Sequence, residues 1–139
     1  MNAVDTNVLV YSVDQDEPAK QAKAIELLDR LTQPPVETVL LWQAAGEFLS
    51  CLRRWHSAGR VTSADVEQYL NRALAMFPLF LPTHSVLGRA LELHSRYSLS
   101  HWDSMLLAAC IEAGVTTLYS EDFGSGATYD TVTVINPFA

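Results

Sequence analysis

The feature that most constrains the fold is an alternation of short β-rich runs with segments of helical periodicity. Runs of β-branched and apolar residues predict strands near residues 2–4, 36–42, 77–81, 116–119 and 131–135. Between these runs, apolar residues recur at helical spacing in segments that begin near Pro18, Thr62 and Ser100. Strands that alternate with helices favour an open sheet covered on both faces. The predicted fold class is α/β, a three-layer α/β/α sandwich with a mostly parallel central sheet of about five strands.

The length of 139 residues corresponds to one domain, so we expect a single domain over residues 1–139. With 49% hydrophobic and 18% charged residues, the chain is too apolar for intrinsic disorder. The two cysteines, Cys51 and Cys110, lie in apolar helix-like segments, and we expect buried free thiols in a reducing compartment. No apolar stretch is long enough to span a membrane and no basic leader is present, so a cytoplasmic protein is expected.

Four acidic residues fall where the predicted topology brings separate segments together. Asp5 and Asp122 each follow a predicted strand, and open parallel sheets bind ligands outside the carboxyl ends of their strands. Asp103 begins a helical apolar stripe continued by residues 106, 107, 110 and 111, so its side chain is predicted to face the interior. Glu47 lies at the edge of the buried face of another predicted helix. Because clustered carboxylates repel one another, we expect a divalent cation among them.

The ligand types favour Mg²⁺ or Mn²⁺, which prefer oxygen ligands. Zinc is disfavoured because the four histidines lack the short paired spacing of a zinc site. Each acidic residue alone also has an ordinary structural explanation. Asp103 suits a capping box with Ser100, and Asp5 suits a helix cap. Glu47 and Asp122 suit a solvated helix edge and a turn. These explanations do not predict that all four fall at one end of the sheet.

Short motifs occur in a characteristic order along the chain. They are Val-Asp-Thr-Asn-Val-Leu at residues 4–9, Glu-Phe-Leu at 47–49, Trp-Asp-Ser at 102–104, Leu-Tyr-Ser-Glu-Asp-Phe at 118–123 and Val-Ile-Asn-Pro-Phe at 134–138. In this order and spacing, the sequence resembles the PIN domain family over essentially its whole length. Its ending is similar to that of the VapC-type toxins of bacterial toxin-antitoxin modules. One small departure is Ser104, where alanine is common in the family.

The resemblance implies a PIN-like nuclease whose Mg²⁺ or Mn²⁺ is held by acidic residues, matched here by Asp5, Glu47, Asp103 and Asp122. It also implies polar residues that support these carboxylates, matched by Thr6, Asn7 and Ser120. The resemblance further implies single-stranded or structured RNA as the substrate, with a 5′-phosphate product. It also implies a cognate antitoxin bound in a groove between the early helices, and a homodimer. The predicted function is therefore an endoribonuclease that hydrolyses phosphodiester bonds as the toxin of a type II toxin-antitoxin system.

The net charge is an objection to a nucleic-acid substrate, because 9 basic and 16 acidic residues give −7 at pH 7. Two divalent ions would change this balance to −3 (−7 + 4) and supply local positive charge. Three arginines after Glu47 are candidates for RNA phosphate contacts or for a solvated helix end: Arg53, Arg54 and Arg60. Trp42, Trp55 and Trp102 could stack on bases, although buried core positions are favoured.

Two other functions fit parts of the sequence. A phosphatase or receiver domain would use Asp5 as a phosphorylated nucleophile. That function is disfavoured because position 7 is asparagine rather than a second acid, and because Lys20 and Lys23 are the only lysines. A metal-free, catalytically inactive interaction module with the same fold stays open at this point.

Overall fold

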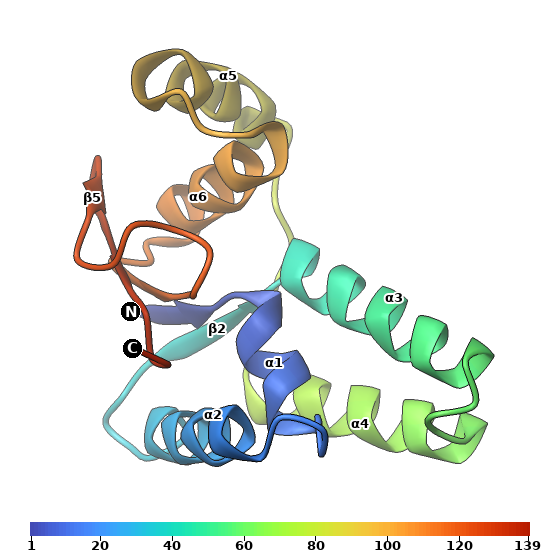
Figure 1. The fold of residues 1–139 in the computed structure, drawn as a ribbon. Coiled ribbons are helices and arrows are strands. Elements are labelled where there is room, and N and C mark those ends of the chain that lie inside the picture. Colours follow the sequence, from blue (N-terminus) through green and yellow to red (C-terminus); the bar gives the residue numbers. More distant parts are fainter.

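The computed structural model describes residues 1–139, and its strands alternate with helices as the sequence predicts (Figure 1). The strands are β1 (Asn2–Val4), β2 (Thr38–Leu41), β3 (Leu79–Phe80), β4 (Thr117–Tyr119), β5 (Thr128–Tyr129) and β6 (Val132–Ile135). The helices are α1 (Thr6–Ser12), α2 (Pro18–Leu31), α3 (Trp42–Ser57), α4 (Ser63–Met76), α5 (Ser85–Tyr97) and α6 (His101–Ala113). The predicted α/β class is confirmed, and the sixth strand is the two-residue β5.

The strands form one sheet in the order β3-β2-β1-β4-β6-β5. All neighbouring pairs are parallel except β5 and β6, which are antiparallel. The chain places β2 on one side of β1 and β4 on the other, so the order of the strands reverses at the β1–β4 pair. Such a reversal opens a crevice outside the carboxyl ends of the strands, where parallel sheets bind ligands. Residues 5 and 120 directly follow the two strands at this point.

Helices cover both faces of the sheet and give three layers (Figure 1). On one face, α5 and α6 pack against side chains that include Ala3, Leu41 and Leu118. On the other face, α1, α2, α3 and α4 form a second core with Val4 and Leu40. Successive strand residues point to opposite faces, which is why Ala3 and Val4 belong to different cores. The predicted three-layer arrangement is confirmed.

Local sequence signals determine where the helices begin and end. Pro18 is the first residue of α2, and Thr62 and Asp65 form a reciprocal capping box at the start of α4. Gly114 ends α6 in the left-handed conformation, with φ of 77°. These boundaries agree with those predicted from the sequence.

The sequence predicts buried free thiols for both cysteines. Cys51 in α3 and Cys110 in α6 are both buried and free, and burial raises the pKa of each thiol. A raised pKa leaves little thiolate, so neither thiol is a reactive nucleophile at neutral pH. None of the six helices has the length and apolar character needed to span a bilayer.

Candidate active site

Asp5 lies at the carboxyl end of β1, beside the carboxyl end of β4. The residue is 6% exposed, and each of its carboxylate oxygens accepts a hydrogen bond of 2.7 Å. Oδ1 accepts from the backbone N–H of Thr6, and Oδ2 accepts from the hydroxyl of Ser120. The register of the two strands pairs Val4 with Tyr119, so the residues that follow them lie side by side. Asp5 is therefore a fixed, buried anion where the strand order reverses, as well as the N-cap of α1.

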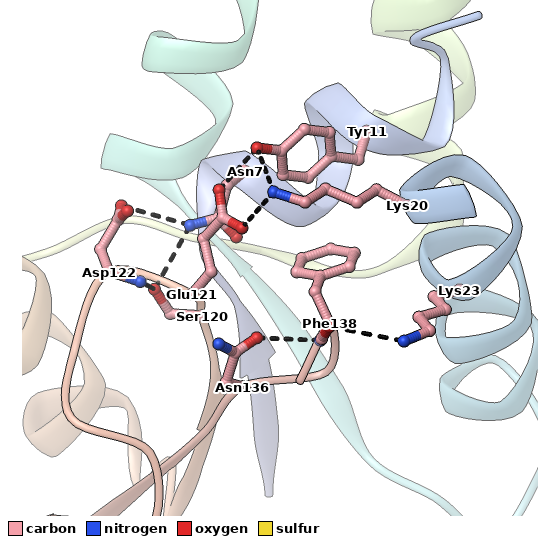
Figure 2. Close-up of polar contacts among 9 residues, drawn as sticks. All are labelled: Asn7, Tyr11, Lys20, Lys23, Ser120, Glu121, Asp122, Asn136 and Phe138. Atoms are coloured by element: carbon pink, nitrogen blue, oxygen red, sulfur yellow. Dashed lines mark hydrogen bonds and ion pairs between the residues drawn. The ribbon is translucent and has the colours of Figure 1, made fainter. Parts of the chain in front are cut away.

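Asp122 is held by hydrogen bonds with Asn7 and Ser120 (Figure 2). The side-chain amide of Asn7 donates to Asp122 Oδ2 at 3.2 Å and to Ser120 Oγ at 3.4 Å. The Ser120 hydroxyl also accepts from the backbone N–H of Asp122 at 3.1 Å. The Ser120 hydroxyl thus donates a hydrogen bond to Asp5 and accepts one from the segment that carries Asp122. The turn expected at Asp122 leaves its carboxylate exposed and oriented by Asn7.

Glu47 approaches the same region from α3. Its Oε2 accepts from the hydroxyl of Thr6 at 3.0 Å, and its Oε1 accepts from the side-chain amide of Gln43 at 2.9 Å. Thr6 begins α1 directly after Asp5, so this contact brings the start of α1 and the first turns of α3 together. Glu47 is exposed, as expected for a helix edge, yet two side chains fix its carboxylate.

Asp103 lies in the first turn of α6 and is half-buried. Its backbone N–H donates to Ser100 Oγ at 3.2 Å, so Ser100 caps the helix. Unlike the reciprocal box formed by Thr62 and Asp65 in α4, the cap of α6 has only this first bond. The Asp103 carboxylate is therefore not occupied by capping. Burial raises the pKa of Asp122, and the charge of Asp103 adds to that rise.

The acidic residues affect one another electrostatically. Burial raises the pKa of Asp5 to about 6, and the charges of Asp122 and Glu47 add to the rise. Hydrogen bonds from Ser120 and Thr6 oppose it, because they stabilise the ionised carboxylate. Burial also raises the pKa of Asp122, with Asn7 lowering it. The cluster thus holds more negative charge than its surroundings compensate, which is the condition that a bound cation relieves.

The acidic and polar side chains at the site can hold a divalent ion only through some of its waters. No three of the His, Cys, Asp and Glu side chains lie close enough together to bind one ion directly. Mg²⁺ normally keeps several waters and takes only one or two carboxylates, so widely spaced acidic side chains fit it. Asn7 Oδ1 is buried without a hydrogen-bond partner, which leaves an acceptor at the site for a donor such as water. The side chains present therefore fit a hydrated ion with oxygen ligands.

The three arginines predicted to contact RNA lie in different surroundings. Arg54 lines an open cavity of about 440 Å³ whose walls come from α1, α3 and the segment after β4: Thr6, Asn7, Val10, Tyr11, Glu47, Ser50, Cys51, Arg54 and Asp122. Arg53 is exposed one residue earlier on α3, outside this lining. Arg60 forms ion pairs with Asp14 at 3.1 Å and Asp16 at 2.8 Å and lies over the ring of Trp55. The structure thus brings only Arg54 to the acidic residues.

The expectation that the tryptophans are buried core residues is wrong for two of them. Trp42 is 56% exposed and Trp102 is 61% exposed. Each occupies the first turn of a helix, and neither belongs to either core. Trp55 is half-buried and packs against the core that contains Phe48.

Two groups near the site were not identified from the sequence. Gln43 donates to both Glu47 and the backbone carbonyl of Trp102, at 3.1 Å for the second bond, and so links α3 to α6. Glu121 accepts from Tyr11 at 2.6 Å and from Lys20 at 3.0 Å, which ties the segment after β4 to α1 and α2 (Figure 2). The only available signals were sequence adjacency to Asp122 for Glu121 and helical spacing from Glu47 for Gln43.

Comparison with protein families identifies a domain over most of the chain. The sequence model of the PIN domain matches residues 3–124 of this chain. A search of curated proteins gave no significant sequence match.

Several solved structures share this fold. A toxin-antitoxin complex from Klebsiella pneumoniae has a TM-score of 0.70 at 20% identity, covering 99% of this chain and 98% of that chain. The sarcin-ricin loop cleaving toxin VapC20 of Mycobacterium tuberculosis has a TM-score of 0.67 at 18% identity, covering 88% and 90%. VapBC2 from Rickettsia felis, bound to a DNA fragment from its promoter, has a TM-score of 0.68 at 11% identity, covering 96% of both chains. At these identities the likeness establishes the fold alone.

Proposed function

The chain belongs to the PIN domain family, and on this premise we propose that it is a metal-dependent endoribonuclease, the toxin of a bacterial type II toxin-antitoxin system. The observation that carries the proposal is the linkage of Asp5, Asp122 and Glu47 through Ser120, Asn7 and Thr6 where the strand order reverses. Burial and mutual repulsion raise the pKa values of Asp5 and Asp122, which favours a role in binding a cation.

Asp5 and Asp103 are the residues proposed to hold Mg²⁺ or Mn²⁺, directly or through water, with Asp122 and Glu47 completing the set. When bound, such an ion lowers the pKa of a coordinated water and offsets negative charge on the scissile phosphate. The separation of the four acidic side chains leaves room for the waters that Mg²⁺ retains and for phosphate oxygens.

The neighbouring polar residues hold these carboxylates in place before substrate arrives. Ser120 fixes one oxygen of Asp5, Asn7 orients Asp122, and Thr6 orients Glu47. Groups fixed in this way need little rearrangement as charge develops on the reacting phosphate. Asp122 and Glu47 are exposed, so they can orient the attacking water at the surface of the cluster.

Phosphate contacts beyond the ion are assigned to Arg54, which lines the same cavity as Glu47 and Asp122. Arg53 is free to contact a more distant phosphate of the strand. Arg60 contributes less, because its guanidinium group already pairs with Asp14 and Asp16.

A cognate antitoxin is the proposed protein partner. An apolar cavity of about 200 Å³ lies between α1, α2, α3 and α4, and its lining includes Tyr69, Met76 and Ile25, whose side chain is 44% exposed. These apolar side chains suit the apolar face of a partner helix, and an arginine of the partner would then extend toward the acidic residues. Co-purification from the native host tests the proposal, since recovery of the chain alone, without a small adjacent reading frame, would contradict the toxin role.

We also propose that residues 1–139 act as one cytoplasmic domain that forms a homodimer. Leu87 and Leu91 on α5 are exposed and line a shallow cavity of about 280 Å³ with His94, which suits contact with a second copy. Light scattering tests this assembly, and a mass near 15.4 kDa over a wide concentration range would contradict it.

The activity itself is tested by offering two classes of substrate to the purified protein. Cleavage of RNA in Mg²⁺ or Mn²⁺, with no release of phosphate from small phosphomonoesters, is the expected result. Phosphate transfer onto Asp5 would favour a phosphatase. The contacts of the two lysines do not support that function, because Lys20 pairs with Glu121 and Lys23 with the Phe138 carbonyl, and neither contacts Asp5. If the protein cleaves no RNA with either metal, a catalytically inactive interaction module is the function that remains.

A further inference from the structure

A cavity of about 480 Å³ lies directly beside the acidic residues, on the side of Glu47 that faces α6. Its lining is mainly apolar and comprises Trp42, Gln43, Gly46, Glu47, Pro82, Val86, Trp102, Met105 and Ala109. Glu47 also lines the cavity that contains Asp122 and Arg54, so the two cavities share a wall. A ligand that reaches the carboxylates can therefore extend into the apolar cavity.

Two contacts hold Trp102, one of the two tryptophans of this cavity, although its side chain is exposed. Gln43 donates to Glu47 Oε1 at 2.9 Å and to the Trp102 carbonyl at 3.1 Å, which fixes the start of α6 against α3. The ring of Trp102 packs edge-on against His101, with 4.6 Å between ring centroids. A fixed aromatic surface loses little conformational freedom when a ligand binds to it.

The fold gives no reason for two indole rings at these positions. Trp42 and Trp102 are 56% and 61% exposed, and neither belongs to the two cores of the protein. Exposed aromatic surface next to a polar site indicates a binding surface. Indole rings bind flat π systems face to face, and nucleobases are the flat groups that a nuclease substrate carries.

The charge of the protein also favours base contacts. A net charge of −7 repels a polyanion, and at the carboxylates the structure brings in only one arginine, Arg54. Contacts with phosphates therefore supply less of the binding free energy than in a basic nuclease. Stacking on aromatic rings does not depend on net charge, so it can hold a strand where electrostatic attraction is weak.

From these observations we propose that Trp42 and Trp102 form a stacking site for unpaired bases of the substrate strand, next to the position of cleavage. The inference rests on the proposed nuclease function and names two residues that would hold its substrate. In a duplex the faces of the bases are stacked on one another, so only single-stranded or looped segments can offer them to the two rings. Such stacking is tolerant of sequence, so it selects strand conformation more than base identity.

The proposal is tested by equilibrium binding in Mg²⁺, with Asp103→Asn as the parent protein so that cleavage is suppressed. The probes are a fluorescein-labelled ten-nucleotide single-stranded RNA and an abasic ribose-phosphate oligomer of the same length, followed by fluorescence anisotropy. Added to this parent, Trp42→Ala and Trp102→Ala should each weaken RNA binding about tenfold. Neither change should affect binding of the abasic oligomer, and Trp102→Phe should keep most of the affinity.

Two controls separate stacking from other effects. Leu74→Ala removes an exposed apolar side chain from α4, away from the cavity, and should leave RNA binding unchanged. Arg54→Ala should reduce the slope of log K against log salt concentration, whereas the tryptophan variants should keep that slope. Light scattering of each variant shows whether the loss of a dimer explains weaker RNA binding. If a tryptophan variant is monomeric while the parent is a dimer, the indole rings contact a second copy of the chain instead of bases.

The outcomes for stacking and for nuclease activity are distinguishable. If wild-type protein cleaves RNA with metal while both tryptophan variants bind RNA as tightly as the parent, the stacking site is wrong and the nuclease proposal stands. Equal binding of RNA and abasic oligomer by the parent would also overturn the stacking site. If wild-type protein binds RNA through the tryptophans but cleaves none with either metal, the stacking site stands and the nuclease proposal fails.

Discussion

The hydroxyl of Ser120 donates a hydrogen bond of 2.7 Å to the carboxylate of Asp5, although the two residues are 115 positions apart. Both residues are buried, and they follow neighbouring parallel strands, β1 and β4. This bond lowers the pKa of Asp5, whereas burial raises it. The serine thereby helps to keep a buried carboxylate ionised, which is the form that can bind a cation.

Replacement of Ser120 tests this relationship. In Ser120→Ala the pKa of Asp5 should rise further, so the acid limb of the pH profile of kcat/KM should move to higher pH. Stability should fall by roughly 1–3 kcal/mol, because the backbone N–H of Asp122 loses its acceptor. Ser104→Ala removes another buried hydroxyl, which donates to the Ser100 carbonyl, and serves as the control. An acid limb that stays in place for Ser120→Ala would contradict the assigned contact.

The raised pKa of Asp5 predicts how the stability of the metal-free protein depends on pH. With a pKa of about 6 in the folded state and 3.8 as the reference, the folded protein binds more protons than the unfolded chain between these values. The free energy of unfolding should therefore fall as the pH rises from about 4 to above 6, by up to about 3 kcal/mol.

Urea unfolding in EDTA at pH 4.5 and pH 7.5 measures this dependence for wild type and Asp5→Asn. The asparagine does not titrate, so the stability of wild type relative to the variant should be greater at pH 4.5 than at pH 7.5. If wild type and Asp5→Asn differ in free energy of unfolding by the same amount at both pH values, the pKa of Asp5 is not raised in the folded protein.

Metal should stabilise the folded protein, because an ion that binds only the folded state shifts the unfolding equilibrium by mass action. The melting temperature of wild type should rise with added Mg²⁺ or Mn²⁺. Metal-free Asp103→Asn should be no less stable than metal-free wild type, since the change removes one repelling charge from the cluster. Thermal melts of both proteins with and without metal make this comparison.

Asp65→Asn is the matched control for Asp103→Asn. Both residues occupy the third position of a helix, but only Asp65 completes a reciprocal capping box. Its replacement should cost on the order of 1 kcal/mol without altering the response to metal. A destabilised Asp103→Asn together with a wild type that does not respond to metal would mean that Asp103 is only a helix cap.

Much of the fold could be predicted because its signals are local. The proline at the start of α2, the capping box of α4 and Gly114 after α6 each specify a boundary through the backbone conformation of a few residues. The short β5 gave no comparable signal, since two residues cannot show an alternating pattern. It is defined by its pairing with β6 through a turn at Asp130, whose φ is 52°.

The positions of the site residues were predictable only as far as they follow from topology. Asp5 and Ser120 meet because β1 and β4 are parallel neighbours, which the alternation of strands and helices makes expected. The pairing of Arg60 with Asp14 and Asp16 depends on how the loop after α3 approaches the turn after α1, and no sequence spacing encodes it. The exposure of Trp42 and Trp102 likewise depends on how the first turns of α3 and α6 pack, which no sequence spacing encodes.

The most direct test of the central claim is the rate of RNA cleavage by wild type, Asp5→Asn and Asp103→Asn in Mg²⁺ and in EDTA. Asp29→Asn makes the same change in charge on the exposed side of α2 and is the control. We predict that EDTA abolishes cleavage, that Asp29→Asn is as active as wild type, and that Asp5→Asn and Asp103→Asn lose activity by about a hundredfold or more while remaining folded by circular dichroism. Full activity in a folded Asp5→Asn or Asp103→Asn, or cleavage that persists in EDTA, would contradict the assignment of these carboxylates to a metal-dependent active site.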